Sequence, residues 1–156
     1  MSPITSSRVQ LALNVSNLAE AIEFYSKYFN TPPAKVRPGY ANFAIAEPPL
    51  KLVLMETSHG AGTINHLGVE YPTSDAVVSE VGRLTADGLI AGAVENTTCC
   101  FAVQDKAWIE GPDGIAWESY TVLADALVMH PGNAETVCCV LPANVEPSTT
   151  VAKACC

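Results

Sequence analysis

Residues 9–15 form the first segment with a regular pattern, a run of apolar and β-favouring residues that predicts a strand. Ser16 or Asn17 can cap a following helix, and Glu20 stands three residues after Asn17, where a capping box needs it. This helix has one apolar face, formed by Leu18, Ile22, Tyr25 and Phe29. A pair of prolines then ends the helix. Three strands are predicted after it, over residues 34–36, 40–45 and 51–55.

The same order of elements begins again near residue 65. Residues 65–70 predict a strand, and Ser74 or Asp75 can cap a second helix. The apolar positions of this helix are Val77, Val81, Leu84 and Leu89. Further strands are predicted over residues 93–95, 101–103, 107–109 and 115–122. The first half therefore reads as a strand, a helix and three strands, the second half repeats this order with one further short strand, and the repeated order predicts a duplicated α+β fold.

This repetition predicts one domain over residues 8–124, built from two βαβββ modules at about 8–56 and 64–124. Residues 125–156 differ, because they contain prolines and small or polar residues without periodicity. They are predicted to form a flexible tail. The tail contains four cysteines, namely Cys138, Cys139, Cys155 and Cys156.

The composition argues against two classes of binding partner, nucleic acids and membranes. The chain has 49% hydrophobic and 15% charged residues and a net charge of −8, which suits a globular acidic protein. Such a protein has no general affinity for nucleic-acid phosphates or anionic membrane surfaces. No apolar run reaches the roughly 18–20 residues of a spanning helix, and the N-terminal segment does not resemble a signal peptide. We therefore expect a cytoplasmic protein without nucleic-acid or membrane partners. The sequence leaves the oligomeric state open, a homodimer included.

The cysteines occur as adjacent pairs, and one pair, Cys99-Cys100, lies within the predicted sheet. Adjacent cysteines close no useful loop, so we expect thiols in a reducing cytoplasm. Neighbouring residues of a regular strand point to opposite faces, so Cys99 and Cys100 can act together only where the backbone turns or bulges. We predict such a loop before a strand that begins at Phe101, and a hairpin turn at Gln104-Asp105-Lys106. Two thiols on a loop can bind a soft atom, although such pairs also serve as small core residues.

Three polar residues stand in otherwise apolar strands. Gln10 lies in the first predicted strand, His66 in the matching strand of the second module, and Glu118 in the last strand. A carboxylate among apolar neighbours is costly to bury without a partner, and a divalent cation is one such partner. An amide, an imidazole and a carboxylate would form a three-point metal site with open coordination positions. Alternatively, His66 is a hydrogen-bonded structural residue, and Gln10 and Glu118 lie on exposed strand faces.

The order of elements resembles the vicinal oxygen chelate superfamily, which includes glyoxalases, bleomycin resistance proteins and extradiol dioxygenases. Six segments resemble, more narrowly, the ArsI-type C–As lyases and the related cadmium-induced proteins of the CadI type. These segments are residues 8–15, 24–27, 37–44, 48–54, 65–70 and 98–106. The resemblance implies two βαβββ modules that form a curled mixed sheet around a metal-binding cleft.

The resemblance to the C–As lyases also implies an activity. These Fe(II)-dependent dioxygenases use O2 to cleave the carbon–arsenic bond of trivalent organoarsenicals, such as methylarsenite and aromatic arsenicals, and release arsenite. By resemblance, Gln10, His66 and Glu118 hold the catalytic Fe(II), and Cys99 and Cys100 bind the arsenical. Gln10 departs from the usual nonheme iron set of two histidines and one carboxylate.

Two other functions remain open. The resemblance to CadI implies, as the alternative, a non-catalytic resistance protein that binds cadmium or arsenite through its thiols. A third function within the superfamily is glutathione transfer to an antibiotic. The adjacent thiols of Cys99 and Cys100 weigh against it, because such an enzyme has no need of a thiol pair.

Overall fold

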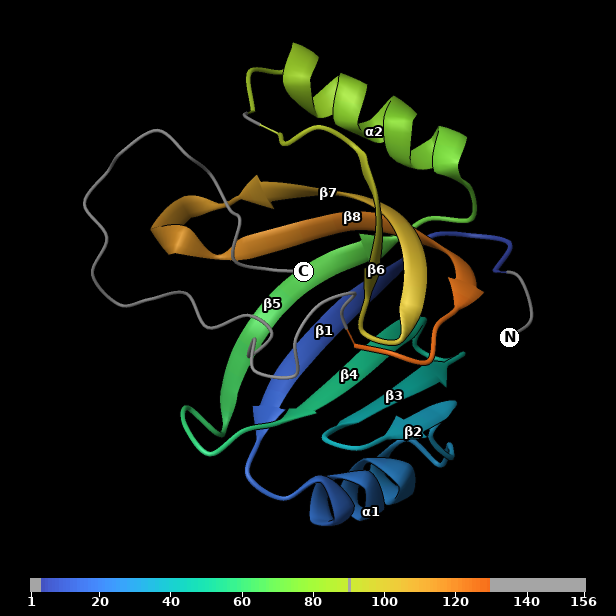
Figure 1. Cartoon of the computed structure of the whole chain (residues 1–156), viewed down its shortest axis with the longest axis vertical. Coiled ribbons are helices and arrows are strands. Elements are labelled where there is room, and N and C mark those ends of the chain that lie inside the picture. The colour runs from blue at the N-terminus through green and yellow to red at the C-terminus, as the bar shows by residue number, and fades with distance from the viewer. Residues whose placement is uncertain (1–3, 90, 130–156) are drawn as a thin grey trace. The chain divides into compact units, whose positions relative to one another are not determined.

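The computed structural model describes residues 4–89 and 91–129. The chain divides into two compact units, Met1–Glu70 and Tyr71–Cys156 (Figure 1). Most of the predicted tail, residues 130–156 with its four cysteines, lies outside the described residues.

The first unit contains a five-stranded mixed sheet and one helix. Its elements are β1 (Arg8–Val15), α1 (Leu18–Tyr28), β2 (Lys35–Arg37), β3 (Tyr40–Ile45), β4 (Leu50–Glu56) and β5 (Thr63–Glu70). The strands lie in the order β2-β3-β4-β1-β5. β1 pairs with β4 in parallel, and the other neighbours pair antiparallel. The compact unit thus includes β5, the strand that opens the second predicted module.

α1 begins where the sequence predicts. Asn17 is the N-cap, because its side-chain oxygen accepts a hydrogen bond from the backbone N–H of Glu20 at 3.1 Å. The helix packs on β3 and β4. The buried core lies between α1 and one face of the sheet. It contains Leu18 of α1 and the β3 and β4 residues Ala41, Phe43, Ile45, Leu52 and Leu54.

Strand alternation sends the neighbouring residues to the opposite face of this sheet. On β1, Gln10 and Ala12 alternate with the helix-facing leucines, and on β4 the same alternation places Lys51 opposite to Leu52. Gln10 and Lys51 are each 4% exposed. The first unit therefore has an apolar face under α1 and a buried face that carries polar residues.

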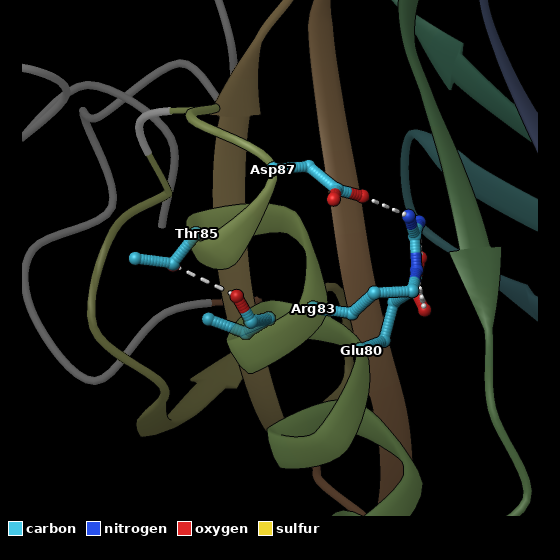
Figure 2. A network of polar contacts seen from close by, with 5 residues as sticks. Glu80, Arg83, Thr85 and Asp87 are labelled. Carbon is cyan, nitrogen blue, oxygen red and sulfur yellow. Dashed lines mark hydrogen bonds and ion pairs between the residues drawn. The ribbon is translucent and has the colours of Figure 1, made fainter.

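The second unit contains one helix and a three-stranded antiparallel sheet in the order β8-β7-β6. Its elements are α2 (Ser74–Ala86), β6 (Glu95–Cys99), β7 (Ala102–Glu110), the short 3-10 helix η1 (Pro112–Gly114) and β8 (Ala116–Asp125). α2 packs on β7 and β8. The outer surface of α2 carries an exposed network in which Arg83 pairs with Glu80 and Asp87 (Figure 2).

The predicted hairpin turn at residues 104–106 is wrong, because Gln104, Asp105 and Lys106 all lie within the continuous strand β7. Their polarity has a tertiary cause. The Ser74 hydroxyl, at 2.5 Å, and the Asn96 amide, at 2.7 Å, both donate to the carboxylate of Asp105. These hydrogen bonds, that of Ser74 first, lower the pKa of Asp105.

The observed elements confirm the predicted fold class. The chain is α+β with a mixed strand arrangement, and the order strand, helix and three strands occurs twice. None of the helices in the described part of the chain is long and apolar enough to cross a membrane.

Candidate functional site

Cys99 and Cys100 lie at a two-residue hairpin turn between β6 and β7. Cys99 is the last residue of β6 and pairs with Ala102, so Cys100 and Phe101 are the two turn residues. Both have positive φ, 54° and 61°. This is the backbone of a type I′ turn, which usually carries Asn or Gly. On a regular strand the two side chains would point to opposite faces, whereas this turn brings the two sulfurs to 3.0 Å from each other.

The turn is held by the backbone of the segment that follows β8. The N–H of Cys100 donates to the carbonyl of Met129 at 3.0 Å, and the N–H of Ala126 donates to the carbonyl of Phe101 at 2.9 Å. Phe101 is buried, 8% exposed. Left-handed backbone at a residue with a side chain costs about 1–2 kcal/mol, so these contacts offset the strain of the turn.

The two sulfurs differ in environment. Cys99 is buried, 2% exposed, whereas Cys100 is half-buried. Cys100 is a free thiol and Cys99 is in the disulfide form. Binding of one soft atom by both sulfurs therefore requires reduction first, since the thiolate is the binding species.

Gln10 and His66 meet on the polar face of the first unit. Their side-chain nitrogens, Nε2 of Gln10 and Nε2 of His66, lie 3.0 Å apart, and both residues are 4% exposed. The strand register accounts for this contact, because His66 pairs with Ala12 on β1, two residues after Gln10. The exposed-face alternative for Gln10 is therefore wrong.

A chain of hydrogen bonds sets the orientation of the His66 ring. Nδ1 of His66 lies 2.7 Å from Oδ1 of Asn65. Asn65 in turn donates through Nδ2 to Oδ1 of Asn14, and Asn14 donates to the Thr63 hydroxyl, which donates to the carbonyl of Gly60. Because Oδ1 of Asn65 can only accept, Nδ1 of His66 carries the proton and Nε2 presents its lone pair toward Gln10.

Glu118 lies in the second unit, on the face of β8 opposite to α2. Its Oε1 is 3.0 Å from Nζ of Lys106, and the side chains are 6% and 2% exposed. The strand register places Lys106 beside Tyr120 and Trp108 beside Glu118. Nζ of Lys106 also lies 5.2 Å from the centroid of the Trp108 ring, a cation–π distance. Glu118 is thus a buried, charge-paired carboxylate, and its exposed-face alternative is wrong.

The structure therefore groups the predicted residues in two sets. Gln10 and His66 come together in the first unit, and Cys99, Cys100 and Glu118 belong to the second. Within residues 4–89 and 91–129 there is no cluster of three or more His, Cys, Asp or Glu side chains. Gln10 belongs to none of these residue types, so the candidate set contains two of them, His66 and Glu118.

Asn65 and Lys106 contact the candidate residues His66 and Glu118, and the sequence did not predict these two contacts. Asn65 directly precedes His66, and a polar residue beside a strand histidine is a usable signal for a group that orients the ring. Lys106 contacts Glu118, which lies twelve residues later on the next strand, and no local pattern in the sequence predicts this pair.

A family model for the Glyoxalase/Bleomycin resistance protein/Dioxygenase superfamily matches residues 7–119. The Cadmium-induced protein CadI of Mycobacterium tuberculosis is 62% identical over 120 residues, which cover 77% of this chain and 79% of that protein. The trivalent organoarsenical cleaving enzyme of Thermomonospora curvata is 49% identical over 151 residues, 96% of this chain and 99% of that enzyme.

Solved structures support the fold alone. The Mn(II)-bound glyoxalase from Novosphingobium aromaticivorans has a TM-score of 0.54 at 17% identity, covering 86% of this chain and 44% of that chain. Methylmalonyl-CoA epimerase from Mycobacterium tuberculosis has a TM-score of 0.53 at 18% identity, covering 79% and 91%. The repeated order of elements, the family match and these relatives agree: the chain belongs to the glyoxalase/bleomycin resistance protein/dioxygenase superfamily, together with CadI and the trivalent organoarsenical cleaving enzymes.

Proposed function

We propose that this protein is a cytoplasmic Fe(II)-dependent dioxygenase that cleaves the carbon–arsenic bond of trivalent organoarsenicals and releases arsenite. The observation that carries the proposal is the pair of sulfurs of Cys99 and Cys100, 3.0 Å apart on a tight turn. A relative named as a trivalent organoarsenical cleaving enzyme, which matches over 96% of this chain, supports the same substrate class.

The thiol pair fits the valence of the substrate. Trivalent arsenic with one carbon substituent has two exchangeable positions, and the reduced thiols of Cys99 and Cys100 can occupy both. The As–C bond then projects away from the sulfurs. Inorganic arsenite has three exchangeable positions and prefers a third thiol, so a site of two thiols favours release of this product. Holding the arsenical by two bonds also fixes its orientation, which is the entropic part of catalysis.

Gln10, His66 and Glu118 are the residues that we propose to hold Fe(II). The donor chemistry fits, because His66 presents an unprotonated Nε2 on a buried face and Gln10 adds an amide beside it. Glu118 adds a buried carboxylate, which is paired with the ammonium of Lys106 through Oε1 and has a second oxygen to offer. When bound, Fe(II) supplies open coordination positions for O2, the co-reactant of the proposed cleavage. The ring orientation set by Asn65 directs the Nε2 lone pair toward Gln10, and a metal bound there would replace the hydrogen bond between Nε2 of His66 and Nε2 of Gln10.

The direct test is release of arsenite. The full-length protein is reduced, loaded anaerobically with Fe(II), mixed with methylarsenite and exposed to O2, and arsenic species are separated by chromatography. We expect arsenite only when Fe(II), O2 and the thiols are all present. Absence of arsenite from protein with full iron occupancy would refute the proposed activity.

A second function is favoured by the 62% identity to a protein named for induction by cadmium. In this alternative the chain only sequesters cadmium or arsenite through Cys99 and Cys100. It predicts stoichiometric uptake of cadmium or arsenite that depends on the cysteines, with no turnover of methylarsenite at any iron loading. The same assay, extended by cadmium binding, therefore separates the two functions.

Asn65 provides a test of the metal assignment that needs no turnover. Asn65→Leu removes the acceptor at Nδ1 of His66, and loss of such an outer partner lowers metal affinity by roughly 10–100-fold. Asn65→Asp keeps the acceptor and should retain most of the affinity. Isothermal titration with Co(II), a stable substitute for Fe(II), measures both. Equal affinity in the Leu and Asp variants would contradict the role of Asn65.

A further inference from the structure

The first unit has a second group of buried charges, which the proposed chemistry does not use. Nε of Arg8 lies 2.7 Å from Oε2 of Glu70, and Nζ of Lys51 lies 3.7 Å from Oε1 of the same carboxylate. The side chains of Arg8, Lys51 and Glu70 are 12%, 5% and 4% exposed. Two cations therefore share one carboxylate in a place with little access to water.

Lys51 forms the longer of the two ion pairs in this group. Its ammonium has three N–H donors, and 3.7 Å is an ion-pair distance that exceeds a hydrogen bond. Glu70 is the one acid that pairs with Lys51 in the described part of the chain. Burial is the main cause that lowers the pKa of Lys51, and the nearby charges of Arg8 and Lys35 lower it further, against the opposing effect of Glu70. A buried ammonium in this position is costly without an additional acceptor.

The position of Lys51 in the sheet relates it to the candidate metal ligands. The parallel register of β1 and β4 makes Lys51 the direct neighbour of Gln10. On the other side, Gln10 pairs with Gly68 of β5, which carries no side chain. The same face carries His66 and Glu70, two residues on either side of Gly68. The excess positive charge thus lies on the polar face of the sheet, beside Gln10.

We propose that Lys51 and Arg8 form a binding site for an anionic oxygen group, such as a carboxylate or phosphate, with Nζ of Lys51 as the main donor. The ligand would supply further acceptors for the three N–H donors of Lys51, in addition to Oε1 of Glu70 at 3.7 Å. It comes either from an acidic substituent on the organic part of the arsenical or from a free anion. The substituent form rests on the proposed function, whereas the binding site itself does not.

Anion binding tests the site directly. Acetate and phosphate are titrated by calorimetry into the reduced full-length protein, with a chelator present so that no bound metal takes the anion. We expect Lys51→Met to weaken binding at least tenfold, Lys51→Arg to retain it, and Glu70→Gln to strengthen it by removing the competing carboxylate. Lys27→Met, at an exposed ion pair on α1, is the matched control and should leave binding unchanged. Thermal unfolding verifies that each variant is folded.

A second arm identifies the source of the anionic group. Binding of phenylarsenite and 4-carboxyphenylarsenite is compared in the reduced protein and in Lys51→Met. A preference for the carboxylated compound that disappears in Lys51→Met assigns the site to the substrate's substituent. Equal binding of both arsenicals, with acetate binding still dependent on Lys51, assigns it to a free anion. If binding of acetate, of phosphate and of the carboxylated arsenical is the same in Lys51→Met as in the unaltered protein, the proposal is overturned. That result would leave the proposed cleavage of methylarsenite untouched, because methylarsenite carries no acidic substituent.

Discussion

Replacement of Cys99 or Cys100 by Ser is expected to abolish tight binding of methylarsenite while metal binding remains. A hydroxyl is a poor ligand for soft arsenic, so each variant keeps only one As–S bond. The second sulfur, 3.0 Å from the first, acts intramolecularly. A second tethered contact of this kind raises affinity by roughly 10²–10⁴-fold, and each single variant should lose a factor of that size.

The measurement is equilibrium binding of methylarsenite to reduced protein, with Co(II) titration in parallel. Thr98→Ala, which keeps both thiols next to the altered position, is the control and should bind the arsenical normally. Loss of Co(II) binding in the Ser variants would mean that the thiols are metal ligands. Such a result would favour the sequestering function over the lyase.

Replacement of His66 or Glu118 by Ala should have the reverse effect. Each change removes a proposed ligand, so metal affinity should fall by more than the roughly 10–100-fold typical of outer partners, and arsenite release should cease. Methylarsenite binding should persist, because both thiols remain. Single-turnover assays with Fe(II), together with Co(II) titration, report the two effects separately. Cleavage that survives both replacements would refute the metal assignment.

Folding must be monitored for Glu118→Ala. Loss of this carboxylate breaks the buried ion pair with Lys106, whose Nζ lies 3.0 Å from Oε1 of Glu118, and breaking a buried ion pair typically costs about 3–5 kcal/mol. The double replacement Lys106→Met with Glu118→Gln removes both charges and so avoids this penalty. Urea denaturation should therefore show the double variant to be more stable than Glu118→Ala. Both should bind Co(II) more weakly than the unaltered protein if Glu118 is a ligand, because neither variant carries the carboxylate.

Much of the fold was predictable because periodic apolar positions report local structure. The spacing of Leu18, Ile22 and Tyr25 predicted α1, and Asn17 is the cap that the capping-box pattern offered. The hairpin turn predicted at residues 104–106 is wrong because the polarity of these residues reports tertiary contacts and not local structure. Gln104, Asp105 and Lys106 are polar because of partners from other elements, and sequence order carries no information about these contacts.

The positions of two candidate residues were also predictable. Alternation along β1 and β5 places Gln10 and His66 on one face, where their side chains lie 3.0 Å apart, and their role in binding a metal stays a prediction. The sequence predicted the positions of the two sulfurs less well. Cys100 and Phe101 adopt positive φ, which their residue types do not favour. That conformation depends on contacts with Ala126 and Met129, more than twenty residues later in the chain.

The two-residue turn also has a consequence for redesign of this protein. Insertion of a single residue between Cys100 and Ala102 would lengthen the connection and release Cys100 from the conformation that aligns its sulfur with that of Cys99. The dipeptide itself would be unchanged, yet the spacing between donor atoms would no longer match one arsenic atom. Under the proposed function, binding of the arsenical depends on the length of this hairpin, so loop insertions elsewhere should be tolerated far better than one at this turn.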